Sequence, residues 1–278
     1  MLSQRRERLI ARLRSSKTRE REDSVLVEGV RAVSEALDAG VTVDFLVTSP
    51  RLRTTKAGER LAERIAARDV IPVDDEELAR LSDTDRPQGA LLVCTEPHAG
   101  LERVTGGGRY LVLDHVQDPG NAGTLVRAAV AFGLGAVVCL DGTVDPWGPK
   151  TVRSSAGMIF RIPVVRATTD QTMERLAAER VPIYVADPEG ADVGDHRGAA
   201  SFALVVGNEG IGVRAEVVER ADLLLGVGMP GPAESLNVAM AGSILLHVLT
   251  RGSNASGGAR PIGLSAPDGD PGAGRDGG

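Results

Sequence analysis

Three short stretches of the sequence hold residues that could bind or position a ligand. The first, DPGNAGTLVRAAVAFG, contains Asn121 and Arg127, the second, LVVGNEGIG, contains Glu209, and the third, MPGPAESLNVAMAG, contains Ser235 and Asn237. Each stretch follows a short apolar run that is typical of a buried strand. Amide, carboxylate, hydroxyl and guanidinium groups therefore follow three separate strands.

The elements that must position these groups alternate between strand and helix. From residue 109 onward the apolar runs YLVLD, AVVCL, RIPVV, VPIYVA, FALVVG and ADLLLGV are separated by helical stretches. This alternation predicts a largely parallel sheet with helices on both faces. In such a sheet ligands bind outside the carboxyl ends of the strands, so we expect the three stretches to form one polar cluster there.

Two of these side chains have an alternative interpretation. Arg127 is a lone cation in an otherwise apolar helix, so it is either part of a structural ion pair or placed at a functional site. Glu209 could equally be an exposed turn residue. Asn121 follows the turn-forming Pro119-Gly120 pair and is predicted to be the N-cap of the helix.

The glycine-rich stretches do not match the common nucleotide-binding motifs. Gly207, Gly210 and Gly212 have the spacing G-x-x-G-x-G instead of the dinucleotide fingerprint, and GTVDPWGPKT lacks the spacing of a phosphate-binding loop. A nicotinamide-dependent oxidoreductase is therefore disfavoured. The glycines instead indicate a backbone that approaches another backbone or a ligand closely.

The chain is long enough for two domains. Residues 1–98 predict a small α/β domain that begins with a basic helix over 1–22, residues 99–108 a flexible glycine-containing linker, and residues 109–250 the second α/β domain; residues 251–278 are predicted to be a disordered tail. The basic helix is either an RNA-binding stripe or a solvated amphipathic helix, and its cationic residues are Arg5, Arg6, Arg8, Arg12, Arg14, Lys17, Arg19 and Arg21.

The composition of the sequence argues against membrane, secreted and metal-binding proteins. The sequence is 42% hydrophobic and 25% charged with a net charge of −6, and its apolar runs are too short for a membrane span. No secretory signal is recognisable, so we expect a cytoplasmic protein. The histidines lack the spacing of a metal site, so none is expected, and Cys94 and Cys139 are predicted to be buried free thiols.

The three stretches resemble, in order and spacing, the signature motifs of the SpoU (TrmH-type) branch of the SPOUT superfamily, S-adenosylmethionine-dependent RNA ribose 2′-O-methyltransferases. The resemblance covers residues 109–250, and the region around VLVEGVRAVSEAL and RPQGALLV looks like a ribosomal-protein-like RNA-binding domain. It implies an α/β trefoil knot in the second domain, S-adenosylmethionine as cofactor and a homodimer.

Roles for individual residues follow from this resemblance. It implies that the cofactor is bound by Gly207, Val227 and Leu236, and that the catalytic cluster consists of Asn121, Arg127, Glu209, Ser235 and Asn237. Because a guanidinium is nearly always protonated, Arg127 is expected to stabilise negative charge that develops on the 2′-oxygen. It is expected to accept the proton only in a strongly perturbed site.

The sequence departs from the family pattern at two positions, and it leaves the substrate open. Gly228 stands where the family has a proline and Ala239 where it has a serine, and the glycine predicts weaker cofactor affinity. We expect ribosomal RNA as the substrate. The alternatives are transfer RNA, or a non-catalytic RNA-binding or ribosome assembly factor that retains the fold.

Overall fold

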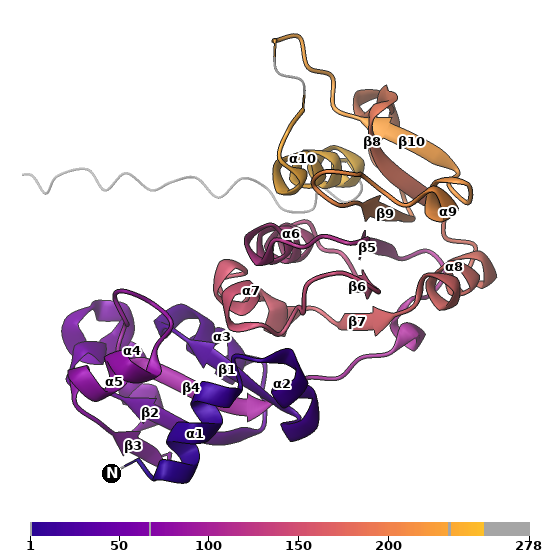
Figure 1. Ribbon diagram of the computed structural model, residues 1–278. Coiled ribbons are helices and arrows are strands. Elements are labelled where there is room, and N and C mark those ends of the chain that lie inside the picture. Colours follow the sequence, from indigo (N-terminus) through magenta and orange to yellow (C-terminus); the bar gives the residue numbers. More distant parts are fainter. Residues whose placement is uncertain (1, 67, 233–234, 253–278) are drawn as a thin grey trace, which may run out of the picture.

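The computed structural model describes residues 2–66, 68–232 and 235–252, which form two α/β domains, each built on one sheet (Figure 1). Residues 253–278 of the expected tail lie outside this described part. The N-terminal domain has a mixed sheet of β1 (Ser24–Glu28), β2 (Val43–Thr48), β3 (Val70–Pro72) and β4 (Ala90–Thr95), in the order β1-β4-β2-β3. Only the β2–β3 pair is parallel among these neighbours.

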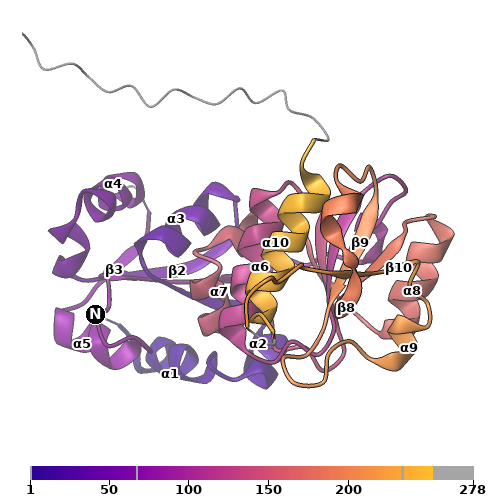
Figure 2. The ribbon, with the colours of Figure 1, turned by 90° about the horizontal axis from the view of Figure 1, so that it is seen from above.

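Helices cover both faces of this mixed sheet (Figure 2). α3 (Val30–Asp38) and α4 (Lys56–Ile65) lie on one face, and α1 (Gln4–Arg12) and α5 (Asp75–Leu81) on the other. α4 follows the short 3₁₀ helix η1 (Pro50–Thr54), and it starts where the Thr55 hydroxyl accepts a hydrogen bond from the Gly58 N–H. Leu61 and Ile65, one turn apart, are both buried on its inner face.

The expectation of a single basic helix over residues 1–22 is wrong. The chain breaks after Leu13 and forms α1 and α2 (Ser16–Glu22) instead. Four of its eight cations are held in ion pairs: Arg12 and Arg21 with Glu22, Arg14 with Asp83, and Arg19 with Asp145. Arg19 is buried, at 3% exposure. The segment is therefore not a continuous free basic stripe.

The C-terminal domain contains the predicted parallel sheet. Its strands are β5 (Arg109–Leu113), β6 (Ala136–Leu140), β7 (Val164–Ala167), β8 (Ile183–Asp192), β9 (Phe202–Val206) and β10 (Leu223–Gly226), in the order β10-β8-β9-β5-β6-β7. Every neighbouring pair is parallel. The predicted α/β class and the order of the two domains are confirmed.

Helices again lie on both faces of the parallel sheet (Figure 1). α6 (Pro119–Ala131), α7 (Pro149–Ser154) and α10 (Val238–Thr250) pack on one face, and α8 (Thr169–Ala178) and α9 (Ala215–Val218) on the other. Short 3₁₀ helices occur at η2 (Leu101–Arg103), η3 (Met158–Arg161) and η4 (Val193–His196).

The trefoil knot that the resemblance implies stays a prediction. After β10 the chain forms α10, which packs on α6. Gly242 makes this contact close, because a Cβ at this position would lie 2.6 Å from Leu125 Cδ2. The Ala199 N–H donates a hydrogen bond to the Leu249 carbonyl and ties down the end of the helix. α10 is apolar on most faces, yet Met240 on its outer face is 56% exposed.

Ion pairs join the two domains. Asp145 accepts hydrogen bonds from Arg19 Nε at 2.8 Å and from Arg166 Nη2 at 2.7 Å, and Arg166 also pairs with the buried Glu96. Burial by itself would raise the pKa of Asp145, but the hydrogen bonds and charges of Arg166 and Arg19 outweigh it and lower the pKa. Asp145 is thus ionised and lies between the cations Arg19 and Arg166 at the contact of the two domains, which we call the seam.

The connecting segment 99–108 is packed, whereas a flexible linker was expected. Val104 is fully buried, and its carbonyl accepts a hydrogen bond from Arg175 Nε at 2.9 Å. The Gly106 N–H donates to the Glu179 carboxylate at 2.7 Å. Composition alone missed these anchors, because they come from α8 and from the residue that follows it.

Cys94 and Cys139 are buried free thiols, as predicted. Desolvation raises the pKa of each to about 12. In the part of the chain that the structure describes, no helix is both long and apolar enough to cross a bilayer.

Candidate active site

The loop after β5 presents the first part of the candidate site. Asp118, not Asn121, is the N-cap of α6, because its carboxylate accepts a hydrogen bond from the Asn121 N–H at 2.9 Å. Pro119 then occupies the first helical position, where its fixed φ angle is favourable. The correction matters for Asn121, since its side-chain amide is left free to make other contacts.

Hydrogen bonds between side chains join the loops after β5, β9 and β10. Asn121 Nδ2 donates to Glu209 Oε1 at 2.9 Å, and Asn237 Nδ2 donates to Asn121 Oδ1 at 3.0 Å. Asn237 Oδ1 in turn accepts from the backbone N–H groups of Ala239 and Met240 as the N-cap of α10. The structure therefore brings together three of the five residues expected in the cluster, and the cap fixes the orientation of the Asn237 amide.

Glu209 is held as a carboxylate. Burial acts to raise its pKa, but the hydrogen bonds from Asn121 and from the backbone N–H groups of Asp118 and Gln117 lower it below the ordinary value. Every one of these groups donates to the charged form of Glu209. The side chain thus anchors the loop after β5 as well as facing the candidate site.

The turn that carries Glu209 depends on glycine. A Cβ at Gly207 would lie within 2.4 Å of the backbone of Gly212 and Val213, so this buried position admits only glycine. Asn208 and Gly212 pair across the turn through reciprocal backbone hydrogen bonds. The close approach of two backbones that the glycine pattern predicted is confirmed.

Asp114 and Arg214 also position this turn, and the sequence analysis missed both. The fully buried carboxylate of Asp114 accepts hydrogen bonds from Arg214 Nε at 2.7 Å and from the Arg214 N–H at 2.8 Å. His115, in the left-handed region at φ 58°, accepts a hydrogen bond through its carbonyl from Asn208 Nδ2. The available signal was the aspartate that ends the apolar run YLVLD.

A cavity of about 430 Å³ opens beside this network. It is lined by all three residues expected to bind a cofactor, Gly207, Val227 and Leu236, and by Glu209, Ser235 and Asn237 of the expected catalytic cluster. Its volume lies within the range of small-molecule sites. Leu225, Val238 and Leu245 add apolar surface, and Asp187 and Pro188 line the same cavity.

A second cavity, of about 560 Å³, lies on the outer side of α6 and α10 and shares Asn237 with the first. Asp118, Asn121, Thr124, Ser154 and Met240 are among the residues that line it. Asn237 therefore borders both cavities, and its hydrogen-bond partner Asn121 borders the outer one.

Arg127 is the expected catalytic residue that the fold leaves apart. It is exposed on α6, about 9 Å further along the helix axis than Asn121, and it lines neither cavity. Within the described residues its side chain makes no hydrogen bond or ion pair, so Arg127 is not part of a structural ion pair, which was the alternative interpretation.

Comparison with known proteins places the chain in a family. Residues 108–247 match the SpoU rRNA Methylase family, which is half of the sequence, and residues 5–92 match the MRM3-like substrate binding domain. The chain belongs to the SpoU rRNA methylase family.

SpoU relatives resemble this chain over nearly its whole length. It is 39% identical over 240 residues to the 23S rRNA (guanosine(2553)-2'-O)-methyltransferase RlmP of Bacillus subtilis, covering 86% of this chain and 93% of the relative. The AdoMet-bound rRNA methyltransferase from Sinorhizobium meliloti superposes with a TM-score of 0.79 at 30% identity, covering 90% of this chain and 96% of that one. The AdoMet complex of the SpoU methyltransferase AviRb from Streptomyces viridochromogenes gives a TM-score of 0.79 at 25% identity, covering 90% and 98%.

The cavity of this SpoU protein suits such a cofactor. Gly226 lines it, and a Cβ at this position would lie 3.0–3.2 Å from the carbonyl oxygens of residues 187, 188 and 190, so glycine lets two backbones approach closely there. Val227 and Leu236 add apolar surface to the same cavity. A Cβ at Gly228 would lie 2.4 Å from Asp192 Oδ2, which is the end of a side chain that can move, so this contact does not require glycine.

Proposed function

We infer that this chain transfers a methyl group from S-adenosylmethionine to a ribose 2′-hydroxyl of ribosomal RNA. The observation that carries the inference is the hydrogen-bonded line from Glu209 through Asn121 to Asn237, which crosses between a cofactor-sized cavity and a second, outer cavity. Membership in the SpoU rRNA methylase family and the AdoMet complexes of similar structures support it. Because RlmP acts on 23S rRNA, we propose 23S rRNA as the substrate.

The loops after β9 and β10 would hold the cofactor. Gly207 brings bare backbone to the cavity, and Val227 and Leu236 would enclose the adenine. When bound, S-adenosylmethionine supplies an activated methyl group for an oxygen nucleophile. The protein then has to position one hydroxyl group and manage one proton.

Asn121, Ser235 and Asn237 are placed for the positioning task. Asn121 and Asn237 line the outer cavity, where a nucleotide would enter, and Ser235 lines the cofactor cavity with Glu209. Glu209 keeps its negative charge and fixes the Asn121 amide, so it is a positioning residue in this account. A guanidinium near the 2′-oxygen would stabilise the charge that develops there.

Arg127 would supply that guanidinium in a homodimer. Its side chain is exposed on α6, and no group within the described chain neutralises it. A second copy that packs on the outer surface of α6 and α10 would cover Met240 and Ile244 and bring its own Arg127 to the outer cavity. We therefore propose that each site is completed by the partner's α6.

Methyl transfer from tritiated S-adenosylmethionine to separately purified RNA pools tests this function. The pools are unmodified 23S rRNA, 16S rRNA and transfer RNA, each with the same amount of protein. Label in 23S rRNA alone is expected. Label in transfer RNA alone would replace the substrate, and no label in any pool despite measured cofactor binding would indicate a binding factor without turnover.

A further inference from the structure

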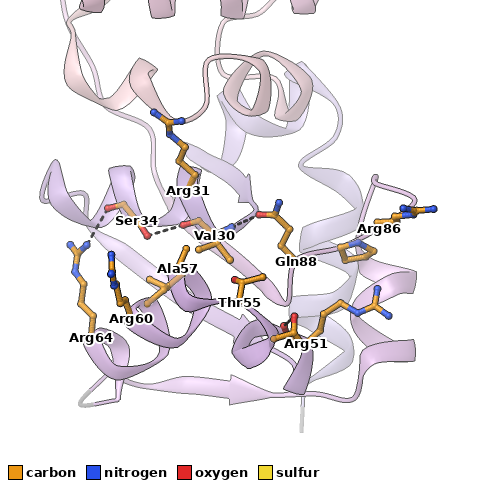
Figure 3. A pocket seen from close by; sticks show the side chains of 13 residues that line it. Val30, Arg31, Ser34, Arg51, Thr55, Ala57, Arg60, Arg64, Arg86 and Gln88 are labelled. Carbon is orange, nitrogen blue, oxygen red and sulfur yellow. Dashed lines mark hydrogen bonds between the residues drawn. The ribbon is translucent and has the colours of Figure 1, made fainter. Parts of the chain in front are cut away.

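The N-terminal domain contains a cavity of about 790 Å³ that the candidate active site does not use. It lies between α3, the η1–α4 segment and the loop that precedes β4. Five arginines line it: Arg31, Arg51, Arg60, Arg64 and Arg86. In Figure 3, Arg60 and Arg64 lie on one side of this arginine groove and Arg51 and Arg86 on the other.

The charge of the arginine groove is uncompensated at three positions. No carboxylate is among the residues that line it, although the whole chain has a net charge of −6. Arg64 pairs with Asp38, and Arg51 lies near Asp75. Arg31, Arg60 and Arg86 make no ion pair or hydrogen bond with another described side chain. Three free guanidinium groups in one hollow form a site for an anion.

The groove is built by specific local contacts. Gln88 Oε1 accepts a hydrogen bond from the Val30 N–H at 2.9 Å and joins the loop before β4 to the start of α3. Gly89, at φ +86°, lets that loop pack against η1, because a Cβ there would lie 2.2 Å from the Leu52 nitrogen. The RPQG stretch therefore holds Arg86 opposite the arginines of α4.

A smaller cavity of about 170 Å³ continues the groove toward the catalytic domain. It shares Arg31, Arg86 and Gln88 with the groove and is closed on its far side by Arg153 of α7. The adjacent residue, Ser154, lines the outer cavity of the candidate active site. One helix of the catalytic domain thus lies between the two hollows.

The carboxylate that lines the small cavity is engaged by other groups. Glu28 lines the small cavity, but it is buried and accepts hydrogen bonds from the Ser82 and Thr84 hydroxyls. Arg153 Nη1 lies 3.7 Å from Glu28 Oε2 and balances its charge. Lys150, one turn earlier on α7, is a further cation, and its Nζ lies 3.7 Å from Asp118 Oδ2 at the outer cavity.

We propose that the arginine groove binds the phosphate backbone of the ribosomal RNA segment that flanks the target nucleotide. The inference rests on the proposed function and adds which surface of the N-terminal domain holds the substrate. Several guanidinium groups along one hollow fit consecutive phosphodiesters, and the route over α7 would lead the strand to Asn121 and Asn237.

The composition of the groove indicates positioning of the RNA more than reading of its bases. No aromatic side chain lines it, so it lacks the stacking platforms that single-stranded bases use. Phosphate contacts fix the register of a nucleic acid but carry little sequence information. Loss of the groove should therefore weaken RNA binding and leave the chosen nucleotide unchanged.

The test compares wild-type protein with the triple variant Arg31→Gln, Arg60→Gln, Arg86→Gln on an unmodified 23S rRNA fragment. The Kd for RNA is measured at several salt concentrations, alongside the Kd for S-adenosylmethionine and the single-turnover rate at saturating RNA. The RNA Kd is expected to rise at least about tenfold near 0.1 M salt, and the slope of log K against log salt to fall by about 2 to 3. The other two quantities should stay within about twofold.

A matched control removes the same charge elsewhere. The variant Arg68→Gln, Arg80→Gln, Arg103→Gln changes three exposed arginines outside the groove and should bind RNA as wild type does. Unchanged RNA affinity in the groove variant, or an equal loss in the control, would overturn the proposal. If wild-type protein binds the RNA but transfers no methyl group, the proposed function fails while the binding comparison still decides the groove.

Discussion

Asn237 Nδ2 donates a hydrogen bond to Asn121 Oδ1 at 3.0 Å, across 116 positions of sequence. The same Asn237 side chain caps α10 through its oxygen, so one amide both starts a helix and orients a second amide in the candidate site. Asn237 thus stabilises the start of α10 and also positions the Asn121 amide, and a substitution can separate these two roles.

Asn237→Asp separates them. Aspartate caps a helix about as well as asparagine, so we expect the free energy of unfolding to change by less than about 0.5 kcal/mol. The variant loses the Nδ2–H donor to Asn121 and puts two acceptors face to face, so the single-turnover rate should fall about tenfold or more. Urea unfolding and a single-turnover assay measure the two effects. A wild-type rate would remove the Asn121–Asn237 contact from the mechanism.

Arg127→Ala is expected to lower the methyl transfer rate by about 10²–10³-fold, because it removes a charge that stabilises the transition state. The Kd for S-adenosylmethionine should stay unchanged, since Arg127 does not line the cofactor cavity. Arg80→Ala, at an exposed position of the other domain, is the matched control. Retained turnover in the Arg127 variant would exclude this residue from catalysis.

Mixed dimers test whether Arg127 acts across a subunit interface. Arg127→Ala and Asn237→Asp chains, each of low activity alone, should regain activity when they are unfolded and refolded together. Some of the refolded dimers are then mixed, and each mixed dimer contains one complete site. Sedimentation of the wild-type protein should show a dimer. A monomer that is fully active, or no recovery in a proven mixed dimer, would contradict the shared site.

Leu236→Ala should raise the Kd for S-adenosylmethionine by about five- to thirtyfold, which corresponds to about 1–2 kcal/mol of apolar burial. Ile211→Ala is the control, because Ile211 is 79% exposed in a neighbouring loop and does not line the cavity. Calorimetric titration measures both variants. Equal affinities for the two variants would move the adenine site away from Leu236.

Glu209 should remain ionised throughout the working range of pH. Its folded-state pKa is depressed below the ordinary 4.5, so the anchoring it provides is present above that value and is lost only as pH falls through the depressed pKa. We expect Glu209→Gln to lower the single-turnover rate by a constant factor between about pH 6 and 9. An acidic limb in this range that is present in wild type and absent from the variant would show that Glu209 titrates during the reaction.

Asp145→Asn tests the seam between the domains. It leaves the buried Arg19 without its counter-charge, so the free energy of unfolding should fall by about 3 kcal/mol. Asp83→Asn is the control, because its pair with Arg14 is more than one third exposed and should be worth about 1 kcal/mol or less. Urea unfolding of both variants makes the comparison, and equal losses would contradict a structural role for the seam.

Local sequence patterns predicted the strands and the convergence of the three loops well. Runs such as YLVL and FALVV are apolar throughout, as strands covered on both faces must be, and their order placed Asn121, Glu209 and Asn237 at one edge of the sheet. The N-cap of α6 was misplaced by three residues, because Pro119 favours the first helical position and thereby selects Asp118.

Features made by residues far apart in sequence were missed for a physical reason. Arg19 reads locally as one more cation of a basic stripe, and only the fold shows that Asp145 neutralises it. The five arginines of the arginine groove come from three segments between positions 31 and 86. In the sequence each of them looks like an ordinary exposed arginine. Local periodicity reports which face is buried, but it does not report which charges meet.

A map of alkali-resistant linkages in unmodified 23S rRNA, made after reaction with the protein and S-adenosylmethionine, shows directly whether the protein methylates a ribose. A 2′-O-methyl group blocks cleavage of the adjacent phosphodiester, because the 2′-oxygen can no longer attack it. We predict one protected linkage with wild-type protein, the same linkage at a lower level with Asn237→Asp, and none above background with Arg127→Ala. Methyl incorporation without any protected linkage would place the methyl group on a base and contradict ribose methylation.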